Sequence, residues 1–347
     1  MNRFVLAGSD SRVLLSHLAL FGLGAILEEA GATPRLGWTS GMEPRPAVHG
    51  AGCTPAEVAV AVRTHATRRA EPDAWVSCTL PDKRGKLRGL MSPRLTTLAI
   101  PEGWRDLEER RNETIDDVTA RRAELDLRML GALGRPAYWR MRDGQRRQDE
   151  GASRWEMQPR NQGSEFVGTR LSPLARAVAA RADDEVLGGL TGAAPVDEIN
   201  SRKADSRTPT GLAAPGPTDN ALAWCALWGF SQLPLALRAR QAAIASGHVG
   251  QSSAGWFHTL TWNDDWRMAR LRSMLASRQA REVAETHVLD RGDDRGVTGV
   301  VSDDAARRWL AARGVRAVLC FPVSRYGSDS APERRAGLAD ICRLAVS

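Results

Sequence analysis

The chain has 347 residues, of which 42% are hydrophobic and 26% are charged, and this composition excludes a disordered chain and predicts a globular protein. Its 48 basic residues exceed its 41 acidic ones, which gives a net charge of +7 and favours contact with polyanions. The length exceeds that of one compact core, so we expect two domains or one domain with a large insertion. The five cysteines are scattered without a Cys-x-x-Cys pair, which is typical of reduced thiols in a cytoplasm and argues against a disulfide framework or a zinc site.

Arginine carries almost all of the positive charge, since Lys83, Lys86 and Lys203 are the only lysines. A guanidinium grips phosphates with a planar fork of donors and stacks on flat rings, so arginines suit a nucleic-acid or acidic-partner surface better than a small-substrate pocket. Codon usage in a GC-rich genome also enriches arginine. The composition therefore indicates a class of partner and no specific activity.

The first predicted element is a helix over residues 11–30, capped by Ser9 or Asp10. Its centre is apolar except for Ser16 and His17, so it should be covered on most sides. No second metal-binding residue lies one turn from His17, which favours a hydrogen-bonded core histidine over a metal ligand.

Further along, residues 35–40 and 75–80 are predicted to form short strands. Thr54 and Pro55 begin a second helix that runs to about residue 69, and a charged helix is predicted over residues 106–130. Helices and strands thus alternate in the first part of the chain. We expect an α/β lobe over residues 1–141.

Two basic segments stand out in this part of the chain. Residues 82–88 place four positive charges around the flexible Gly85, a pattern that fits either a cradle for a phosphate backbone or a solvated turn. Residues 142–168 are poor in aliphatic side chains and are predicted to form a basic linker or exposed loop. Between Arg135 and Arg181 ten arginines face five acids, with Trp139 and Trp155 interleaved as a base-stacking surface would require.

The second half is predicted to be richer in helices. A helix begins at Ser172 and ends near residue 187, and a loop rich in glycine, proline and threonine follows over residues 188–217. Residues 217–220 then cap an apolar helix that carries Trp224 and Trp228, which should form the core of this half. This apolar run falls short of about 20 residues and contains polar side chains, so we expect no membrane span.

The remaining elements are a strand over residues 255–262, a basic helix over residues 264–282 and a tail of strand, helix, strand and helix. On an ideal helix Arg267, Arg270, Arg278 and Arg281 would share one face. That face would either track a nucleic-acid backbone or be a solvated surface paired with nearby acids.

Two groups of histidine and aspartate are candidate metal-nuclease sites: His258 with Asp264 and Asp265, and His287 with Asp290, Asp293 and Asp294. Their spacings fit no specific metal motif. Nucleophile motifs and phosphate-binding loops are missing, and the only Gly-x-Gly near the start lies inside an apolar helix. We therefore expect no cofactor, no metal and no catalytic residue.

Residues 160–167 (RNQGSEFV), 208–211 (TPTG) and 215–221 (PGPTDNA) resemble segments of type I CRISPR surveillance complex subunits, with the nearest likeness to large-subunit-like proteins of type I-G, formerly I-U. A fainter echo lies at residues 16–23. The resemblance covers about residues 155–235 and carries no catalytic signature. It implies a non-enzymatic subunit of a ribonucleoprotein that contacts crRNA or target DNA, with the nuclease recruited separately.

We therefore predict an α+β fold, helix-rich with short mixed strands and two lobes: residues 1–141, a basic linker or loop over 142–168, and a helix-rich lobe with a small α/β tail over 169–347. The predicted function is a cytoplasmic, non-enzymatic nucleic-acid-binding subunit of a CRISPR-type antiviral complex, with other subunits as partners. A metal-dependent nuclease and a protein scaffold are the alternatives. The predicted nucleic-acid-binding residues are Lys83, Arg84, Lys86, Arg88, Arg146, Arg147, Arg160, Arg170, Arg202, Lys203, Arg207, Arg267, Arg270, Arg278 and Arg281.

Overall fold

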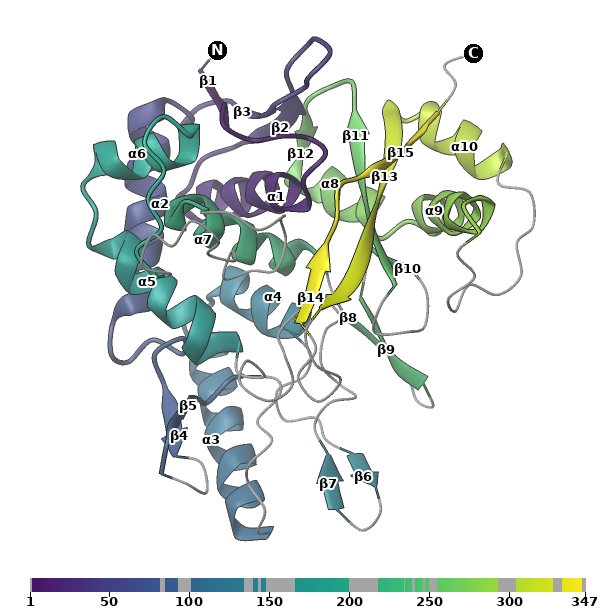
Figure 1. Ribbon diagram of the computed structural model, residues 1–347. Helices are drawn as coiled ribbons and strands as arrows, with labels where there is room; N and C mark the ends of the chain where they lie inside the picture. The colour runs from purple at the N-terminus through teal and green to yellow at the C-terminus, as the bar shows by residue number, and fades with distance from the viewer. Residues whose placement is uncertain are drawn as a thin grey trace.

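A computed structural model combines helices with antiparallel sheets, which confirms the predicted α+β class (Figure 1). None of its described helices is long and apolar enough to cross a membrane. The structure describes residues 2–81, 85–92, 101–133, 140–142, 145–147, 166–199, 218–233, 235–238, 241–245, 247–249, 255–292, 304–326 and 333–344.

The helix α1 (Leu14–Glu29) lies at the centre of the molecule, and every residue from Leu14 to Leu27 is buried (Figure 1). Its apolar residues surround the helix instead of lining one face, which is typical of a helix covered on all sides. The helix α7 (Asn220–Gly229) packs directly on it. Glycines permit this close crossing, because a Cβ at Gly229 would lie 2.2 Å from the carbonyl oxygen of Leu18.

Two antiparallel sheets lie beside α1. The first has the strand order β1 (Arg3–Val5), β3 (Pro46–His49), β2 (Arg35–Trp38) and β12 (Trp266–Arg267). The second runs β10 (His248–Val249), β11 (Trp256–Trp262), β13 (Val315–Tyr326) and β14 (Glu333–Ala336), with β15 (Asp340–Arg343) also paired to β13. His17 of α1 lies between the sheets, in ring contact with Trp38 and Phe321.

The other helices cover this centre. On one side α2 (Pro55–Ala70) packs against α5 (Ser172–Ala179) and α6 (Asp183–Thr191), and its cap at Thr54 is the predicted one. On the other side α9 (Arg278–Asp290) and α10 (Asp304–Ala311) pack on β13. Short hairpins complete the described elements: β4–β5 (Thr79–Pro81 and Leu87–Gly89), β6–β7 (Arg140–Arg142 and Gln145–Arg147) and β8–β9 (Leu235–Arg238 and Gln241–Ala245).

Three predicted helices are each interrupted. The predicted charged helix is divided into two helices, α3 (Pro101–Ala120) and α4 (Glu124–Leu133), because Arg122 between them adopts a left-handed conformation with φ 54°. The helix from Ser172 ends at Ala179, and a new one starts at Asp183. The basic helix over 264–282 is wrong as a single element: it comprises β12, α8 (Met268–Leu275) and α9, and Ser277 caps α9 through its hydroxyl.

Two smaller predictions also differ. Residues 75–77 form a turn, and the strand there is β4, which begins at Thr79. The final predicted helix is absent from residues 333–344, where β14 and β15 are strands. The boundary at 142–168 stays a prediction, although described contacts cross it, since β12 pairs with β2 and α7 packs on α1.

Candidate nucleic-acid interface

Four basic side chains lie in one register row across the first sheet. Arg3 of β1 pairs with His49 of β3, His49 pairs with Arg35 of β2, and Arg35 pairs with Arg267 of β12. Residues directly opposite one another in antiparallel strands project from the same face of the sheet. We call Arg3, His49, Arg35 and Arg267 the basic row.

The basic row faces away from the core, because each neighbouring residue faces into it. The adjacent register row consists of Phe4, Val48, Leu36 and Trp266, and all four are buried. Side chains alternate between the two faces of a strand, so the apolar row fixes the direction of the basic one. Arg3 and Arg267, at the two ends, are exposed, whereas Arg35 and His49 are half-buried.

The arginines of this row have little local compensation. Within the described residues, the side chains of Arg3, Arg35 and Arg267 make no hydrogen bond or ion pair. Asp265 lies 3.6 Å from Nε2 of His49, over Gly37, where a Cβ would come within 2.2 Å of its carboxylate. Burial lowers the pKa of His49, the Asp265 charge opposes that change, and Arg3 adds to it. Like charges on adjacent strands repel, so the row gains energy from an external anion.

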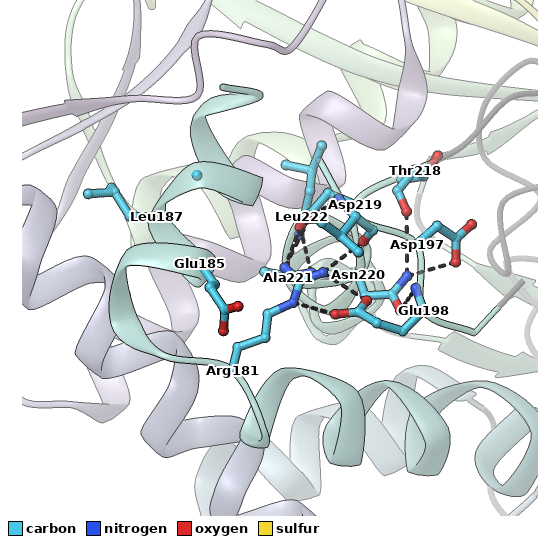
Figure 2. Close-up of polar contacts among 12 residues, drawn as sticks. Arg181, Glu185, Leu187, Asp197, Glu198, Thr218, Asp219, Asn220, Ala221 and Leu222 are labelled. Carbon is cyan, nitrogen blue, oxygen red and sulfur yellow. Dashed lines mark hydrogen bonds and ion pairs between the residues drawn. The ribbon is translucent and has the colours of Figure 1, made fainter. Parts of the chain in front are cut away.

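A second feature, shown in Figure 2, is a buried polar network around Arg181. Its guanidinium donates to both carboxylate oxygens of Glu198, at 2.7 and 2.8 Å, and to those of Asp219, at 3.1 and 2.9 Å. It also donates to the carbonyl oxygen of Val196 at 2.7 Å. Arg181 is only 7% exposed, and this arrangement pairs its charge fully.

The adjoining residue Asn220 extends the network to the preceding loop. Its side-chain oxygen accepts from the backbone N–H groups of Glu198 and Ile199, and its amide donates to Asp197 and to the carbonyl of Thr218. We call Arg181, Glu198, Asp219 and Asn220 the latch.

The latch fixes both ends of the segment 200–217, which itself lies outside the described residues. Asp219 joins the two sides, because it accepts from the N–H of Val196 and also caps α7 through the N–H groups of Ala221 and Leu222. Gly189 of α6 leaves room for this carboxylate, since a Cβ there would meet Oδ1 at 2.2 Å. The donors at the start of α7 are therefore occupied by protein and are not an anion site.

The predicted loop over 188–217 begins too early, because α6 continues to Thr191. Residues 196–199 and 218–220 are the anchors held by the latch, and residues 200–217 between them are not described. The predicted binding residues Arg202, Lys203 and Arg207 belong to the segment between these anchors and lie outside the described residues. The same holds for Lys83, Arg84 and Arg160.

The structure places the other predicted residues apart from one another. Lys86 and Arg88 belong to the β4–β5 hairpin, and Arg170 lies in the π-helix η1 (Val167–Leu171). Each of these three residues takes part in an interaction. Arg146 and Arg147 are in β7, and their side chains lie outside the described part.

The four arginines of residues 264–282 do not form one helix face, which corrects that prediction. Arg267 belongs to the basic row, and Arg270 lies over the ring of Trp266 at 5.0 Å and donates to the carbonyl of Arg313. Arg278 and Arg281 form ion pairs one turn along α9, with Glu282 at 2.6 Å and Glu285 at 2.7 Å. The alternative of a solvated, acid-paired surface holds for these last two.

The first group of histidine and aspartate is divided between the core and the surface. His258 is buried in β11 with no hydrogen-bond partner for either ring nitrogen, and burial lowers its pKa to about 4. Asp264 is exposed beyond the end of that strand. His287 lies 3.5 Å from Asp340, whereas Asp293 and Asp294 lie outside the described residues. Among the residues that are described, no group of three or more His, Cys, Asp or Glu side chains could hold a metal ion.

Sequence reasoning missed three members of the basic row: Arg3, Arg35 and His49. The alternation of Arg35 and Leu36 shows which face each side chain takes in a predicted strand. The pairing of β2 with β12, about 230 residues away in sequence, leaves no comparable local signal. Searches for related proteins gave no match to this chain among protein-family models, curated proteins or solved structures.

Proposed function

We propose that this protein is a non-enzymatic nucleic-acid-binding subunit of a CRISPR-type antiviral ribonucleoprotein, and that it contacts the backbone of crRNA or target DNA through arginines. The observation that carries the binding part of this proposal is the basic row. Its three arginines have no ion-pair partner in the described structure and lie on an outward sheet face.

The geometry of the row suits a run of phosphates. Strands lie about 4.8 Å apart, so four adjacent strands spread the row over about 15 Å. Each guanidinium can donate two parallel hydrogen bonds to a phosphate, and such charge-assisted bonds are the strongest kind available to a protein surface. Contacts of this type fix position on the strand and carry no base identity, so binding should be largely independent of sequence.

The surroundings of the row support the non-enzymatic part of the proposal. Arginine stays protonated and cannot serve as a general base. Burial lowers the pKa of His49, and Asp265 lies 3.6 Å from its Nε2. His258 is sealed in the core with its ring nitrogens away from solvent. The assignment to a CRISPR complex rests on the resemblance at residues 160–167 and 215–221, the second of which includes Asp219 and Asn220 of the latch.

The binding test compares two triple variants of equal charge. The first replaces Arg3, Arg35 and Arg267 by Gln. The matched control replaces Arg68, Arg105 and Arg308, three exposed arginines outside the row. Binding to labelled single- and double-stranded RNA and DNA is measured from low to moderate salt. The row variant should lose affinity and flatten the plot of log K against log salt by about 0.7 to 0.9 for each contact removed.

Equal losses in both variants would contradict the row as a binding face, because they would reflect net charge alone. The complex is tested separately by co-expression with the backbone subunits and crRNA of a type I system. The chain should co-purify with the assembled particle and should leave it when crRNA is omitted. Absence of the chain from the particle would overturn the CRISPR assignment, and the result of the binding test would still stand.

A further inference from the structure

A cleft of about 630 Å³ lies where the β2–β3 hairpin meets the loop before α1 and the ends of β11, β13 and β15. It is separate from the basic row, which projects from the outer face of the first sheet. The residues of the cleft wall that matter here are Arg12, Arg316, Arg343, Trp38, Met42 and Ile341.

Strand register shows how Arg343 is directed. Arg343 pairs with Ala317 of β13, and Ala317 pairs with Thr261 of β11, so the three side chains share one sheet face. Thr259 and Ile341 lie on the same face one step further along. This is the face that contacts α1, because the Thr259 hydroxyl is 3.1 Å from Nδ1 of His17.

Arg12 lies in the loop before α1, where hydrogen bonds of its backbone hold it. Its N–H donates to Asp10 at 2.8 Å, and its carbonyl accepts from Ala339 at 2.9 Å. The carbonyl of the preceding residue, Ser11, lies 2.7 Å from Nε2 of the buried His17. A wall fixed in this way needs little reordering when a ligand binds, which favours affinity.

The charge of the cleft is unbalanced. Within the described residues, the guanidinium groups of Arg12, Arg316 and Arg343 make no hydrogen bond or ion pair. Of the acids in the wall, Glu43 is paired with Arg45 at 2.8 Å, which leaves Asp10 as the one other carboxylate that lines this cleft. The cleft therefore presents an excess of positive charge to its occupant.

The same cleft also carries an aromatic and apolar wall. Met42 is fully exposed, Ile341 is 40% exposed, and both line this cleft together with Trp38. The indole N–H of Trp38 is buried and has no hydrogen-bond partner. A donor buried in this way is closed to a ligand in the cleft, so Trp38 offers its ring for contact.

We propose that this cleft binds a nucleotide that carries a terminal phosphate. The arginines would take the phosphate monoester, which bears nearly two negative charges near neutral pH, and Trp38 with its apolar neighbours would take the base. The volume is in the range of small-ligand sites. The nucleotide could be a free nucleoside monophosphate or the phosphorylated end of a strand, and in either form the site goes beyond the proposed function and does not depend on it.

The experiment measures the binding of AMP by calorimetry. Binding of a short single-stranded oligonucleotide, with either a 5′ phosphate or a 5′ hydroxyl, is measured by fluorescence anisotropy. The variants are Arg343→Gln and Arg12→Gln, with Arg308→Gln as the control on the exposed surface of α10. Loss of one charged hydrogen-bond donor should weaken AMP binding by about tenfold or more, and the control should match the parent. Thermal melting of each variant verifies folding.

The outcomes are distinct. AMP binding that falls in Arg343→Gln supports the site, and a matching preference for the phosphorylated strand identifies a strand end as the source, whereas AMP binding without that preference identifies the free nucleotide. Inorganic phosphate that competes as well as AMP would overturn base recognition, and displacement of AMP by a polyglutamate peptide at similar concentration would favour an acidic segment instead. If neither AMP nor the 5′ phosphate is recognised, the proposal is wrong, even if the basic row binds strands.

Discussion

Gly22 of α1 lies directly against the carbonyl oxygen of Cys225 in α7, so closely that a Cβ on Gly22 would be 1.8 Å from that oxygen. The two helix backbones therefore touch without side chains between them. Such an approach is possible only for glycine, and it positions α7 and with it the latch at the start of that helix.

Gly22→Ala should therefore destabilise the protein by about 3 kcal/mol or more, because backbone atoms must move apart in a packed core. Gly131→Ala is the matched control, since it lies in α4 with no atom within 4 Å of a new Cβ. That change should stabilise by about 0.5–1 kcal/mol through helix propensity. Urea denaturation measures both, and equal effects would show that the α1–α7 contact is not tight.

The basic row makes a prediction about stability in the absence of nucleic acid. Arg35 has a histidine and an arginine as its register neighbours, so Arg35→Gln relieves repulsion and should raise stability by a few tenths of a kcal/mol at low salt. The gain should shrink as salt screens the charges. Thermal melting at two salt concentrations tests this, and a loss of stability at low salt would mean that Arg35 has a stabilising partner.

The latch should be sensitive to the loss of one charge. Asp219→Ala removes an acceptor for Arg181 and the cap of α7, and leaves the guanidinium short of a partner. We expect a loss of about 3–5 kcal/mol. The control Asp183→Ala removes an exposed carboxylate that pairs with Arg63, and should cost about 1 kcal/mol or less. Chemical denaturation measures the loss of stability in both variants. Equal losses would contradict a stabilising role of the latch.

Buried histidines predict a loss of stability in mild acid. Burial lowers the pKa of His17 and of His258 to about 4 from the usual 6.5. Below pH 6.5 the unfolded chain takes up protons that the folded protein refuses, so their contribution is present above pH 6.5 and is lost as pH falls toward 4. Each histidine accounts for about 3 kcal/mol over that interval, as an order of magnitude.

The variant His258→Leu isolates one of these groups. It replaces a ring with no hydrogen-bond partner by an apolar side chain of similar size, and so should raise stability near pH 7 by about 1–2 kcal/mol. It should also make the fall between pH 6.5 and 4 shallower. Denaturation curves at several pH values check both effects, and a pH profile that superimposes on that of the parent would refute the assignment.

The sequence predicted those features that depend on neighbours along the chain. The core role of His17, the start of α2 at Thr54 and a cap for α7 within residues 217–220 follow from local pattern, and each is confirmed. The cap predicted at Ser9 or Asp10 is wrong, because α1 begins at Leu14 without a side-chain cap. The breaks at Arg122 and Ser277 were missed because the flanking residues keep a helical pattern through them. Tertiary packing decides such breaks more than propensity does.

The candidate binding residues were harder to predict, because they depend on which strands pair. Arg3, Arg35 and Arg267 come from three distant parts of the sequence and meet only through register. Arg12 and Arg343 meet at the cleft for the same reason. Clusters of arginine along the chain, such as residues 135–181, show charge density and carry no information on how it converges in space.

The burial of α1 on all sides bears on how the protein is made. Its most extensive contact is with α7, which the ribosome synthesises roughly 10–40 s after α1 at ordinary rates of elongation. During that time this apolar helix has β2, β3 and α2 beside it but lacks its main partner. Fragments that stop before residue 218 should accordingly be captured by chaperones or aggregate, and expression would be more sensitive to premature termination than to slow initiation.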